Sequence, residues 1–462
     1  MKWTLSAIAQ AVGGELVGDG NVQAQGVSTD SRNIPAGSLF IALKGDRFDA
    51  HDYLDAALQA KAVGVLVSRL EKVPAGLAAV VVDDTRLALG RLAAAWRATF
   101  DLPLIGVTGS NGKTTTKEMI AAVLKAQFGE AVLATQGNFN NDIGLPLTLL
   151  GLNEHHQAAV IEMGMNHPGE IDYLTHIARP TAAVVTNAQR AHLEGMGDLA
   201  EVAREKGCIF NGLSDNGVAA ISLDSDFADL WKTQVAPHTA LTFGNRGLAN
   251  EPANVQGEIK QHGLSTQLKI TTHEDSADIR LQVPGRHNAE NALAAAAVCL
   301  AAGLPLSSIA TGLAAFSGVK GRLQKSALSG GGLLLDDTYN ANPDSVRAGI
   351  DVLASTVGRK ILVLGDMGEI GEASGQYHDE VGGYAKSQGI DRLLTLGEAS
   401  QITCRSFGEG GQHFKQPEPL ISALRKLLTA DCTVLVKGSR FMKMERISHG
   451  LLEADAQQAG EK

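Results

Sequence analysis

Apolar runs of strand length alternate with helix-periodic stretches over most of the chain. In the middle of the chain, apolar runs lie at residues 104–107, 158–163, 182–186 and 218–222. In its last part, further runs lie at 333–335, 360–364, 392–396 and 433–436. The stretches between the runs include predicted helices over 86–100 and 288–302. Strands that alternate with helices indicate parallel, doubly wound α/β sheets.

The first part of the chain has shorter elements. Apolar residues at helical spacing predict a first helix over residues 5–12 rather than a secretory signal peptide, because Gln10 interrupts the apolar stretch. A second helix is predicted over 53–60, and strands are predicted over 38–43, 63–67 and 79–82. Further along, polar and alternating segments between 240 and 283 predict an antiparallel extension of the middle sheet.

The length of 462 residues is too great for one ordinary hydrophobic core and favours about three domains. We expect a small N-terminal α/β domain over 1–83, a central parallel-sheet domain over 84–318, and a C-terminal Rossmann-like α/β domain over 319–462. Several predicted strands of the third domain end in polar residues, Asp337 among them. Ligands bind beyond the carboxyl ends of strands in open α/β sheets, so this edge could close over a ligand of the central domain.

Composition narrows the classes of function. The chain is 44% hydrophobic with charge spread along it, which indicates a globular protein, and its net charge of −10 argues against a surface that coats nucleic acid. The four cysteines are scattered without a C-x-x-C pair, and we interpret them as reduced thiols. The longest apolar stretch, 292–304, is too short to span a bilayer, so we expect a buried helix there and no membrane insertion.

The most informative stretch covers residues 104–116 and reads LIGVTGSNGKTTT. A strand, a glycine-rich loop and a helix in this order predict a phosphate-binding loop, whose backbone N–H groups and helix N-terminus surround phosphate oxygens. The strict G-x-x-x-x-G-K-[ST] pattern fails at one position, where Val107 replaces the first glycine. Lys113 would reach the terminal phosphates, and the Thr114 hydroxyl would hold Mg²⁺. The residues predicted to bind a nucleoside triphosphate are Thr108, Gly109, Ser110, Asn111, Gly112, Lys113 and Thr114.

Two residues at predicted strand ends are candidate metal ligands. Glu162 ends the apolar run at 158–163, and in a phosphate-loop protein a neighbouring strand usually supplies an acid to the Mg²⁺ shell. The alternative is a carboxylate that only caps the next loop. His192 follows the run at 182–186 and is either a metal ligand or an ordinary polar residue.

Lys206 is notable for its position on a predicted helix. It shares one helical face with apolar residues such as Val202 and Phe210, whereas Arg204 and Glu205 lie off that face and can be solvated. An uncompensated ammonium on an apolar face is costly, so Lys206 either pairs with an acid or is chemically modified. A surface lysine that extends its amine into solvent is the alternative.

Polar residues elsewhere could complete a binding site. The stretch 136–146 concentrates amides, and its Asn138 and Asn141 could contact sugar hydroxyls or phosphates or could simply form a turn. In the word HNAEN at 287–291, Asn288 could cap a helix and Asn291 could reach an adenine edge. Arg322 lies near the predicted second domain boundary, where a cation could meet a triphosphate.

Taken together and in this order, these motifs resemble the Mur ligases of peptidoglycan synthesis. The resemblance covers nearly the whole chain and also rests on DDTYNANPDS at 336–345 and KGSR at 437–440. The N-terminal words DSR at 30–32, PAGSLF at 35–40 and DAHD at 49–52 look like the substrate domain of the two later ligases. The member that adds the third amino acid carries a DNPR word, which is missing here. YNANP at 339–343 and AHLEG at 191–195 instead look like the member that adds D-Ala-D-Ala to UDP-N-acetylmuramoyl-tripeptide.

The resemblance implies a cytoplasmic, ADP-forming amide ligase that uses ATP and Mg²⁺ and passes through an acyl phosphate. In the family, Thr114 and Glu162 would hold one Mg²⁺ and His192 a second, and Lys206 matches a lysine found carbamylated, whose anion can help to hold metal. The resemblance also assigns residues to each substrate: Asn291, Arg322 and Asp337 to the nucleotide, with Asp337 toward its ribose, and Asp30, Ser31 and Arg32 to the UDP end of the precursor.

Three alternatives remain at this point. The ligase that adds the third amino acid is the nearest one. Folylpolyglutamate synthase shares the central and third domains but lacks the N-terminal block with the DSR word. A nucleotide-switched sensor that binds a cell-wall precursor without turning it over needs only the phosphate loop, and the additional Glu162, His192 and Lys206 argue against it. We expect a monomer that binds UDP-N-acetylmuramoyl-tripeptide and D-Ala-D-Ala and no nucleic acid.

Overall fold

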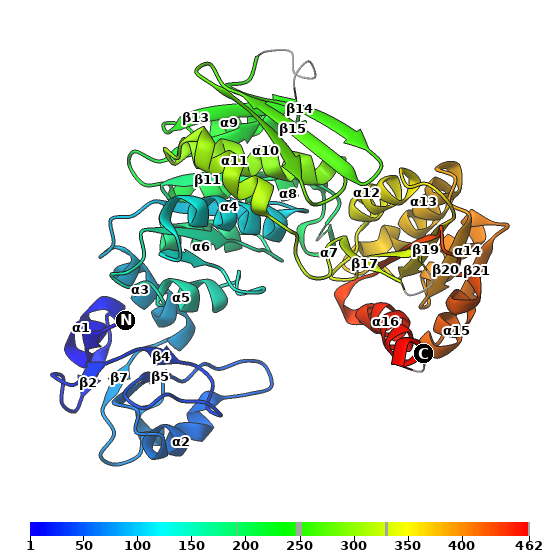
Figure 1. The fold of residues 1–462 in the computed structure, drawn as a ribbon. Coiled ribbons are helices and arrows are strands. Elements are labelled where there is room, and N and C mark those ends of the chain that lie inside the picture. The colour runs from blue at the N-terminus through cyan, green and yellow to red at the C-terminus, as the bar shows by residue number, and fades with distance from the viewer. Residues whose placement is uncertain (192, 246–251, 329–330, 461–462) are drawn as a thin grey trace.

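The computed structural model describes residues 1–191, 193–245, 252–328 and 331–460. Figure 1 shows three groups of elements: a blue N-terminal unit, a cyan-to-green central unit that contacts it, and a yellow-to-red C-terminal unit on the other side of the central unit. Each unit has its own main sheet with helices against it. The three-domain α/β architecture predicted from the sequence is confirmed.

The N-terminal unit is built on a five-stranded sheet with the order β2-β7-β6-β5-β4, in which the pairs from β4 to β7 are parallel. The bounds of its elements, through the long helix that leaves it, are β1 (Trp3–Thr4), α1 (Leu5–Val12), β2 (Glu15–Val17), β3 (Gln23–Ala24), β4 (Val27–Ser28), β5 (Leu39–Ile41), η1 (Ala50–Tyr53), α2 (Leu54–Gln59), β6 (Gly64–Val67), η2 (Leu70–Lys72), β7 (Ala79–Val81) and α3 (Thr85–Arg97). The predicted elements are present within two residues of their expected ends, except that α3 ends three residues before the expected position.

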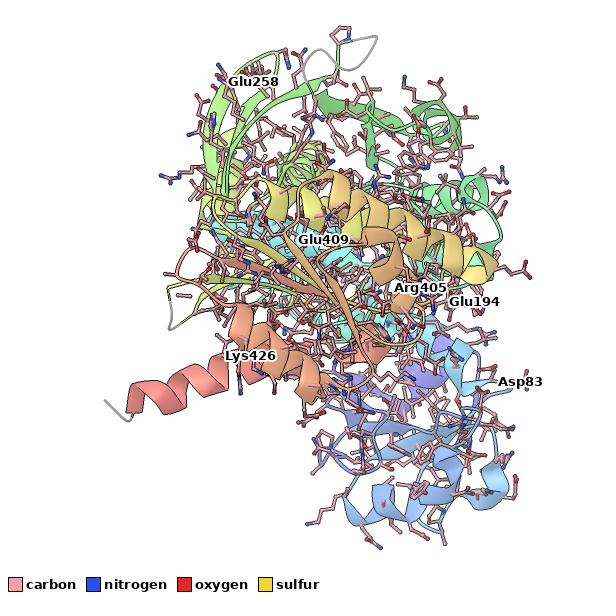
Figure 2. The ribbon with its side chains drawn as sticks, turned by 90° about the vertical axis from the view of Figure 1, so that its right-hand side faces the viewer. Asp83, Glu194, Glu258, Arg405, Glu409 and Lys426 are labelled. Carbon is pink, nitrogen blue, oxygen red and sulfur yellow. The ribbon has the colours of Figure 1, made fainter. Side chains whose placement is uncertain are left out.

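The first hydrophobic core continues from the N-terminal unit into the central one. Ile8 of α1, Leu89 of α3 and Leu149 of the central unit belong to one buried cluster. Asp83 lies just before α3 at the boundary predicted from the sequence, with its side chain pointing outward (Figure 2). Because this core is shared by two units, it does not mark a domain boundary at any one residue. The boundaries at 83 and 318 therefore stay predictions.

The central unit is built on a nine-stranded sheet with the order β16-β15-β14-β13-β12-β11-β8-β10-β9. Its elements are β8 (Leu104–Thr108), α4 (Lys113–Phe128), β9 (Val132–Ala134), α5 (Gly144–Leu149), β10 (Ala158–Glu162), α6 (Glu170–Ala178), β11 (Ala182–Val185), α7 (Leu193–Met196), α8 (Leu199–Gly207), η3 (Cys208–Gly212), β12 (Val218–Ser222), α9 (Ala228–Gln234), β13 (Thr239–Asn245), β14 (Val255–His262), β15 (Ser265–Thr271), β16 (Ser276–Leu281), α10 (Arg286–Ala301) and α11 (Leu306–Ala315).

Alternate residues of the central strands face two different cores. Along β10, Ala159 and Ile161 belong to the cluster shared with the N-terminal unit, whereas Ala158 and Val160 belong to a second cluster with α4, α10 and α11. Both faces of these strands are therefore covered, which is why they are apolar throughout rather than alternating. The polar side chains of such a sheet lie at the ends of its strands.

The predicted antiparallel extension is confirmed for β14, β15 and β16 and is wrong for β13. β13 pairs in parallel with β12 on one side and with β14 on the other. The reason on the β12 side is the intervening helix α9, because a strand–helix–strand crossover returns the chain in the same direction. Alternating polarity alone does not distinguish this arrangement from a hairpin.

The C-terminal unit is built on a six-stranded sheet with the order β17-β18-β22-β19-β20-β21, parallel except for β17. Its elements are β17 (Gln324–Ala327), β18 (Leu333–Asp337), α12 (Pro343–Ala354), β19 (Lys360–Gly365), η4 (Gly371–Ala373), α13 (Ser374–Ser387), β20 (Arg392–Leu396), α14 (Ser400–Phe407), β21 (Gly411–Phe414), α15 (Pro417–Leu427), β22 (Thr433–Lys437), η5 (Arg440–Met442) and α16 (Glu445–Gly460). Within the described residues, no helix is long and apolar enough to cross a membrane.

The packing of α11 against α4 supports the helix that begins at Lys113 and generates a stability prediction. A Cβ added at Gly312 of α11 would lie 2.4 Å from the Val123 Cα of α4, which is backbone and cannot rotate away. We expect Gly312→Ala to lower the free energy of unfolding by about 1–3 kcal/mol. In the matched control Gly383→Ala, a helical glycine with open space around it, the free energy should stay the same or rise by up to about 1 kcal/mol. Urea unfolding measures both, and equal changes would contradict the packing argument.

Candidate functional site

The loop between β8 and α4 approaches other parts of the chain so closely that its glycines cannot be replaced. Gly109 has a φ of 150° and Gly112 a φ of 78°, both in the region that favours glycine. An added Cβ would lie 1.9 Å from Thr186 Oγ1 at Gly109 and 2.2 Å from Asn291 Oδ1 at Gly112. The loop therefore has the tight backbone path of a phosphate-binding loop, and Asn291 lies directly against it.

Lys113 is folded back over this loop. Its Nζ donates hydrogen bonds to the Gly109 carbonyl at 2.7 Å and to the Ser110 carbonyl at 3.2 Å. Burial lowers the pKa of Lys113, and repulsion from Arg322 lowers it further, while Glu162 opposes the shift. The buried ammonium thus lies near a cation and a carboxylate, and the negative charge of a phosphate would stabilise it.

Glu162 lies at the end of β10, next to the phosphate-loop strand. β10 and β8 pair in parallel with Glu162 opposite Val107, so the carboxylate emerges beside the loop. Its Oε1 accepts a hydrogen bond from Asn140 Nδ2 at 2.7 Å. Its Oε2 is buried and has no hydrogen-bond partner among the described residues. A buried carboxylate oxygen without a donor is a ligand that a divalent cation can use.

Lys206 is fully buried on α8, as the helical pattern predicted. Its Nζ is buried and has no hydrogen-bond partner in the part of the chain that the structure describes. Burial moves the pKa of Lys206 well below its ordinary value, and the charge of Lys113 moves it in the same direction. Both effects favour the neutral, nucleophilic amine over the ammonium.

The solvated position expected for Glu205 is wrong. Glu205 is buried, and its carboxylate accepts hydrogen bonds from the backbone N–H groups of Gly169 and Ile171, both at 2.9 Å. These N–H groups lie at the start of α6, where a helix leaves donors without intrahelical acceptors and where its dipole favours an anion. Helical periodicity along α8 cannot reveal that the end of another helix lies beside it.

The C-terminal unit contributes cations and a carboxylate to the opposite side of the site. Arg322 donates a hydrogen bond from Nη2 to Thr114 Oγ1 at 3.0 Å, and its guanidinium lies 4.3 Å from the centre of the Tyr339 ring. Asp337 and Lys437 are paired residues at the ends of β18 and β22, and the Lys437 Nζ lies 2.6 Å from Asp337 Oδ2. The carboxyl ends of these strands thus face the phosphate loop.

A cavity of about 880 Å³ lies between the two units. The predicted residues that line it are Ser110, Asn111, Gly112, Lys113, Thr114, Asn138, Asn141, Glu162, Asn291, Arg322 and Asp337. Thr108 and Gly109 lead into the loop from β8, and Lys206 is not among the residues that line the cavity. His192 lies outside the described residues. The structure therefore brings together most of the residues expected to bind the nucleotide and the metal.

The predicted substrate residues of the N-terminal unit lie elsewhere. Asp30, Ser31 and Arg32 are outside the set of residues that line the cavity. Arg32 is exposed and donates two side-chain hydrogen bonds to Asp30, which lowers the pKa of that carboxyl to about 2. These residues form a charged turn on the surface of the N-terminal unit. If they contact a ligand that also occupies the cavity, that ligand must be long, and they can contact only one end of it.

Several polar residues of the site were not predicted from the sequence. Asn140, which holds Glu162, lies in the amide-rich stretch from which Asn138 and Asn141 were selected, so composition signalled the segment but not the residue. Lys437 was noted only as part of the KGSR motif and was given no role. The suggested capping role of Asn288 is wrong, because Gly285 is the N-cap of α10 and the Asn288 side chain donates to the Pro284 carbonyl.

Comparisons with known proteins cover the chain almost from end to end. Family models match three consecutive stretches: "Mur ligase family, catalytic domain" at 23–97, "Mur ligase middle domain" at 107–299, and "Mur ligase, glutamate ligase domain" at 321–440. The chain is 43% identical over 452 residues to the UDP-N-acetylmuramoyl-tripeptide–D-alanyl-D-alanine ligase of Escherichia coli K12, with 97% of this chain and 98% of that protein covered.

Solved structures give the same result. A crystal structure of MurF from Acinetobacter baumannii has a TM-score of 0.92 and 36% identity, covering 98% of this chain and 99% of that one. MurF from Thermotoga maritima in complex with ADP has a TM-score of 0.82 and 26% identity, covering 94% and 99%. With a relative of this identity over its full length, the chain belongs to the Mur ligase family.

Proposed function

We propose that the protein is an ATP-dependent, ADP-forming ligase that joins D-Ala-D-Ala to UDP-N-acetylmuramoyl-tripeptide. The observation that carries this proposal is the match of 97% of the chain, at 43% identity, to the Escherichia coli ligase of that name. The geometry supports it, because a phosphate loop, a buried carboxylate and an arginine from the C-terminal unit surround one cavity. We expect the enzyme to act in the cytoplasm as a monomer.

ATP is assigned to the cavity between the central and C-terminal units. The backbone of Thr108, Gly109, Ser110, Asn111, Gly112, Lys113 and Thr114 would surround its phosphates. Asn291, which lies against Gly112, would contact the adenine, and Asp337 would accept from the ribose hydroxyls. The Thermotoga maritima relative was crystallised with ADP, which supports nucleotide binding by this fold.

The residues at the loop fit Mg²⁺. Glu162 offers a buried carboxylate oxygen that has no donor among the described residues, and Thr114 offers a hydroxyl at the start of α4. Mg²⁺ commonly takes one or two protein ligands and completes its shell with phosphates and water, so this small set is sufficient. His192 would hold a second Mg²⁺, and Lys206 would assist as a carbamate. The bound ions would neutralise phosphate charge.

The reaction brings anions together, and this chain supplies the charges that oppose their repulsion. A carboxylate oxygen at the end of the tripeptide attacks the γ-phosphorus of ATP, the bond to ADP breaks, and an acyl phosphate forms. The amine of D-Ala-D-Ala then attacks the acyl carbon, and phosphate leaves as the amide forms. Lys113 and Arg322 would stabilise the charge that develops on the phosphoryl oxygens. Water must be excluded while the acyl phosphate exists.

The precursor would extend away from this cavity. Asn138 and Asn141 line it on the side of the 136–146 loop and would contact the sugar or peptide part of the precursor. Asp30, Ser31 and Arg32 would bind near its UDP end on the N-terminal unit. Their separation from the cavity agrees with a substrate that carries a nucleotide at one end and a peptide at the other.

The first prediction tests the substrates. With ATP and UDP-N-acetylmuramoyl-tripeptide, D-Ala-D-Ala should release phosphate and give a pentapeptide product, because full-length relatives carry that name. With the UDP-N-acetylmuramoyl-dipeptide, lysine or diaminopimelate should release little phosphate. Phosphate release and mass spectrometry of the product measure both reactions. If the dipeptide with a single amino acid were the better pair, the protein would be the preceding ligase of the family.

The second prediction concerns Lys206. We expect Lys206→Ala to lose activity by at least about tenfold, because a group that helps to hold the metal would be missing. Formate or acetate in the buffer should restore part of the activity by replacing the carbamate anion. The control is Arg204→Ala on the exposed face of the same helix, which should keep its activity. A fully active Lys206→Ala would make Lys206 a structural residue.

The third prediction concerns Lys113. We expect Lys113→Ala to lower the turnover number by at least about 100-fold with the fold intact, because Lys113 offsets charge that grows in the transition state. Lys125→Ala on the same helix is the control, since Lys125 is exposed and pairs with Glu130. Phosphate release and circular dichroism measure the two properties. Near-normal turnover by folded Lys113→Ala would defeat the assignment.

A further inference from the structure

A short loop lies between the phosphate loop and the C-terminal unit. Residues 187–191 follow β11, and they are bonded to the phosphate loop on one side. Ser110 donates its backbone N–H to the Asn187 carbonyl, and Asn111 donates its own to Asn187 Oδ1, both at 2.9 Å. Ser110 Oγ also donates to the Gln189 carbonyl at 3.0 Å. This loop therefore follows the position of the phosphate loop closely.

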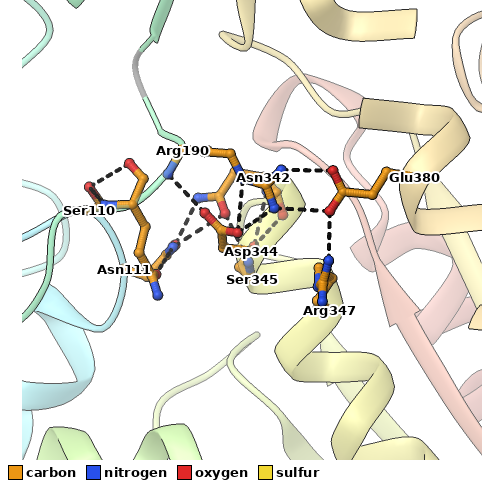
Figure 3. A network of polar contacts seen from close by, with 9 residues as sticks. Ser110, Asn111, Arg190, Asn342, Asp344, Ser345, Arg347 and Glu380 are labelled. Atoms are coloured by element: carbon orange, nitrogen blue, oxygen red, sulfur yellow. Dashed lines mark hydrogen bonds and ion pairs between the residues drawn. The ribbon is translucent and has the colours of Figure 1, made fainter. Parts of the chain in front are cut away.

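On its other side the same loop is bonded to α12 and α13 through Arg190 (Figure 3). The Arg190 backbone N–H donates to Asp344 Oδ2 at 2.9 Å, and its Nε donates to Asp344 Oδ1 at 3.0 Å. Its Nη1 donates to Glu380 Oε2 at 2.8 Å, and its guanidinium lies over the Tyr377 ring. One arginine of the central unit thus holds two carboxylates of the C-terminal unit.

A second bridge joins the phosphate loop to α12 directly. Asn342 Nδ2 donates to Asn111 Oδ1 at 2.8 Å, and Asn111 Nδ2 donates to Asn342 Oδ1 at 3.3 Å. Asn342 is also the N-cap of α12, in a capping box with Ser345. The start of α12 is consequently tied to the phosphate loop by side-chain amides and to the 187–191 loop by Arg190, as Figure 3 shows.

We propose that Arg190 is a positioning residue that couples ATP use to ligation by holding α12 against the 187–191 loop. This inference rests on the proposed function. The bonds of Arg190 fix the C-terminal unit, and with it Arg322 and Asp337, relative to the phosphate loop. When they are lost, the units separate more easily and water reaches the acyl phosphate. Water then attacks the acyl carbon in place of the amine, so the tripeptide carboxylate and phosphate are released and no amide forms.

Arg347 provides a matched control for this network. It donates from Nη1 to Glu380 Oε1 at 2.8 Å, so it shares a carboxylate with Arg190. Both residues of that pair belong to the C-terminal unit, on α12 and α13. Arg347→Met therefore removes an arginine from the same cluster while every bond between the units stays in place. The effect of Arg347→Met therefore shows what the loss of one positive charge in the cluster does while the contact between the units is kept.

The test measures phosphate and pentapeptide product in the same reaction with ATP, UDP-N-acetylmuramoyl-tripeptide and D-Ala-D-Ala. The unmodified protein should release one phosphate per product formed. Arg190→Met should raise the ratio of phosphate to product by at least about threefold. Arg347→Met should keep the ratio of the unmodified protein, and Arg190→Lys should fall between, because lysine cannot hold both carboxylates with a planar fork. Adding Glu380→Gln to Arg190→Met should raise the ratio no further, since both act on one contact.

A second measurement keeps the inference separate from the proposed function. The radius of gyration from solution scattering should be larger for Arg190→Met than for the unmodified protein or Arg347→Met. If the unmodified protein gives no pentapeptide, the proposed function fails and scattering alone decides the role of Arg190. If Arg190→Met gives an unchanged ratio and an unchanged radius of gyration, the inference is overturned. If that variant does not fold, Glu380→Gln, which cuts one of the two contacts of Arg190, is tested in its place.

Discussion

The burial of basic groups around the phosphate loop is the constraint on which the site depends. Lys113, Lys206 and Arg322 lie near one another in surroundings with little water, and burial together with mutual repulsion lowers the pKa of both lysines. Glu162 and Glu369 oppose the shift of Lys113, and Glu205 opposes that of Lys206, but burial outweighs them. At the phosphate loop itself, Lys113 and Arg322 favour an anion such as a phosphate group. Burial, and after it the charge of Lys113, lowers the pKa of Lys206 and so favours its neutral amine, which is the form that can react with carbon dioxide to give a carbamate.

Two parallel sheets bring these groups together by the same rule. In the central sheet, β8 and β10 lie side by side, so that the phosphate loop and Glu162 emerge from the same edge. In the C-terminal sheet, the adjacent β18 and β22 end in Asp337 and Lys437. Because the carboxyl ends of parallel strands meet at one edge, each sheet concentrates its polar residues there. The cavity forms where the two edges face each other. Residues that are far apart in the sequence therefore line one cavity, and no long binding loop is needed to bring them together.

Features that depend on the order of neighbouring residues, such as strands and loops, could be predicted from the sequence. Features that depend on contacts between distant segments could not. Apolar runs located the inner strands of the three sheets but not edge strands such as β4, β9 and β21. The glycine pattern located the phosphate loop, and the apolar face of α8 predicted that Lys206 is buried. Glu205 was misplaced because its partners are the N–H groups of another helix, and β13 was misplaced because alternating polarity does not encode strand direction. Arg190 was missed for the same reason as Glu205: its carboxylate partners lie 154 and 190 positions away, and periodicity along one element carries no information on them.

Amide side chains make many of the connections around the phosphate loop, and their neutrality explains why. Asn111 and Asn342 join the two units, Asn187 holds the phosphate loop, and Asn140 holds Glu162. A carboxylate in these places would repel the phosphates, and another lysine would add to the repulsion that already lowers the pKa values of Lys113 and Lys206. An amide both donates and accepts, so it can form a reciprocal pair without altering the local charge. Ion pairs between the units are made at Arg190, where Arg190 and Arg347 face the carboxylates of Asp344 and Glu380. Asn111 and Arg322 serve both purposes, because each lines the cavity and each forms a hydrogen bond between the two units.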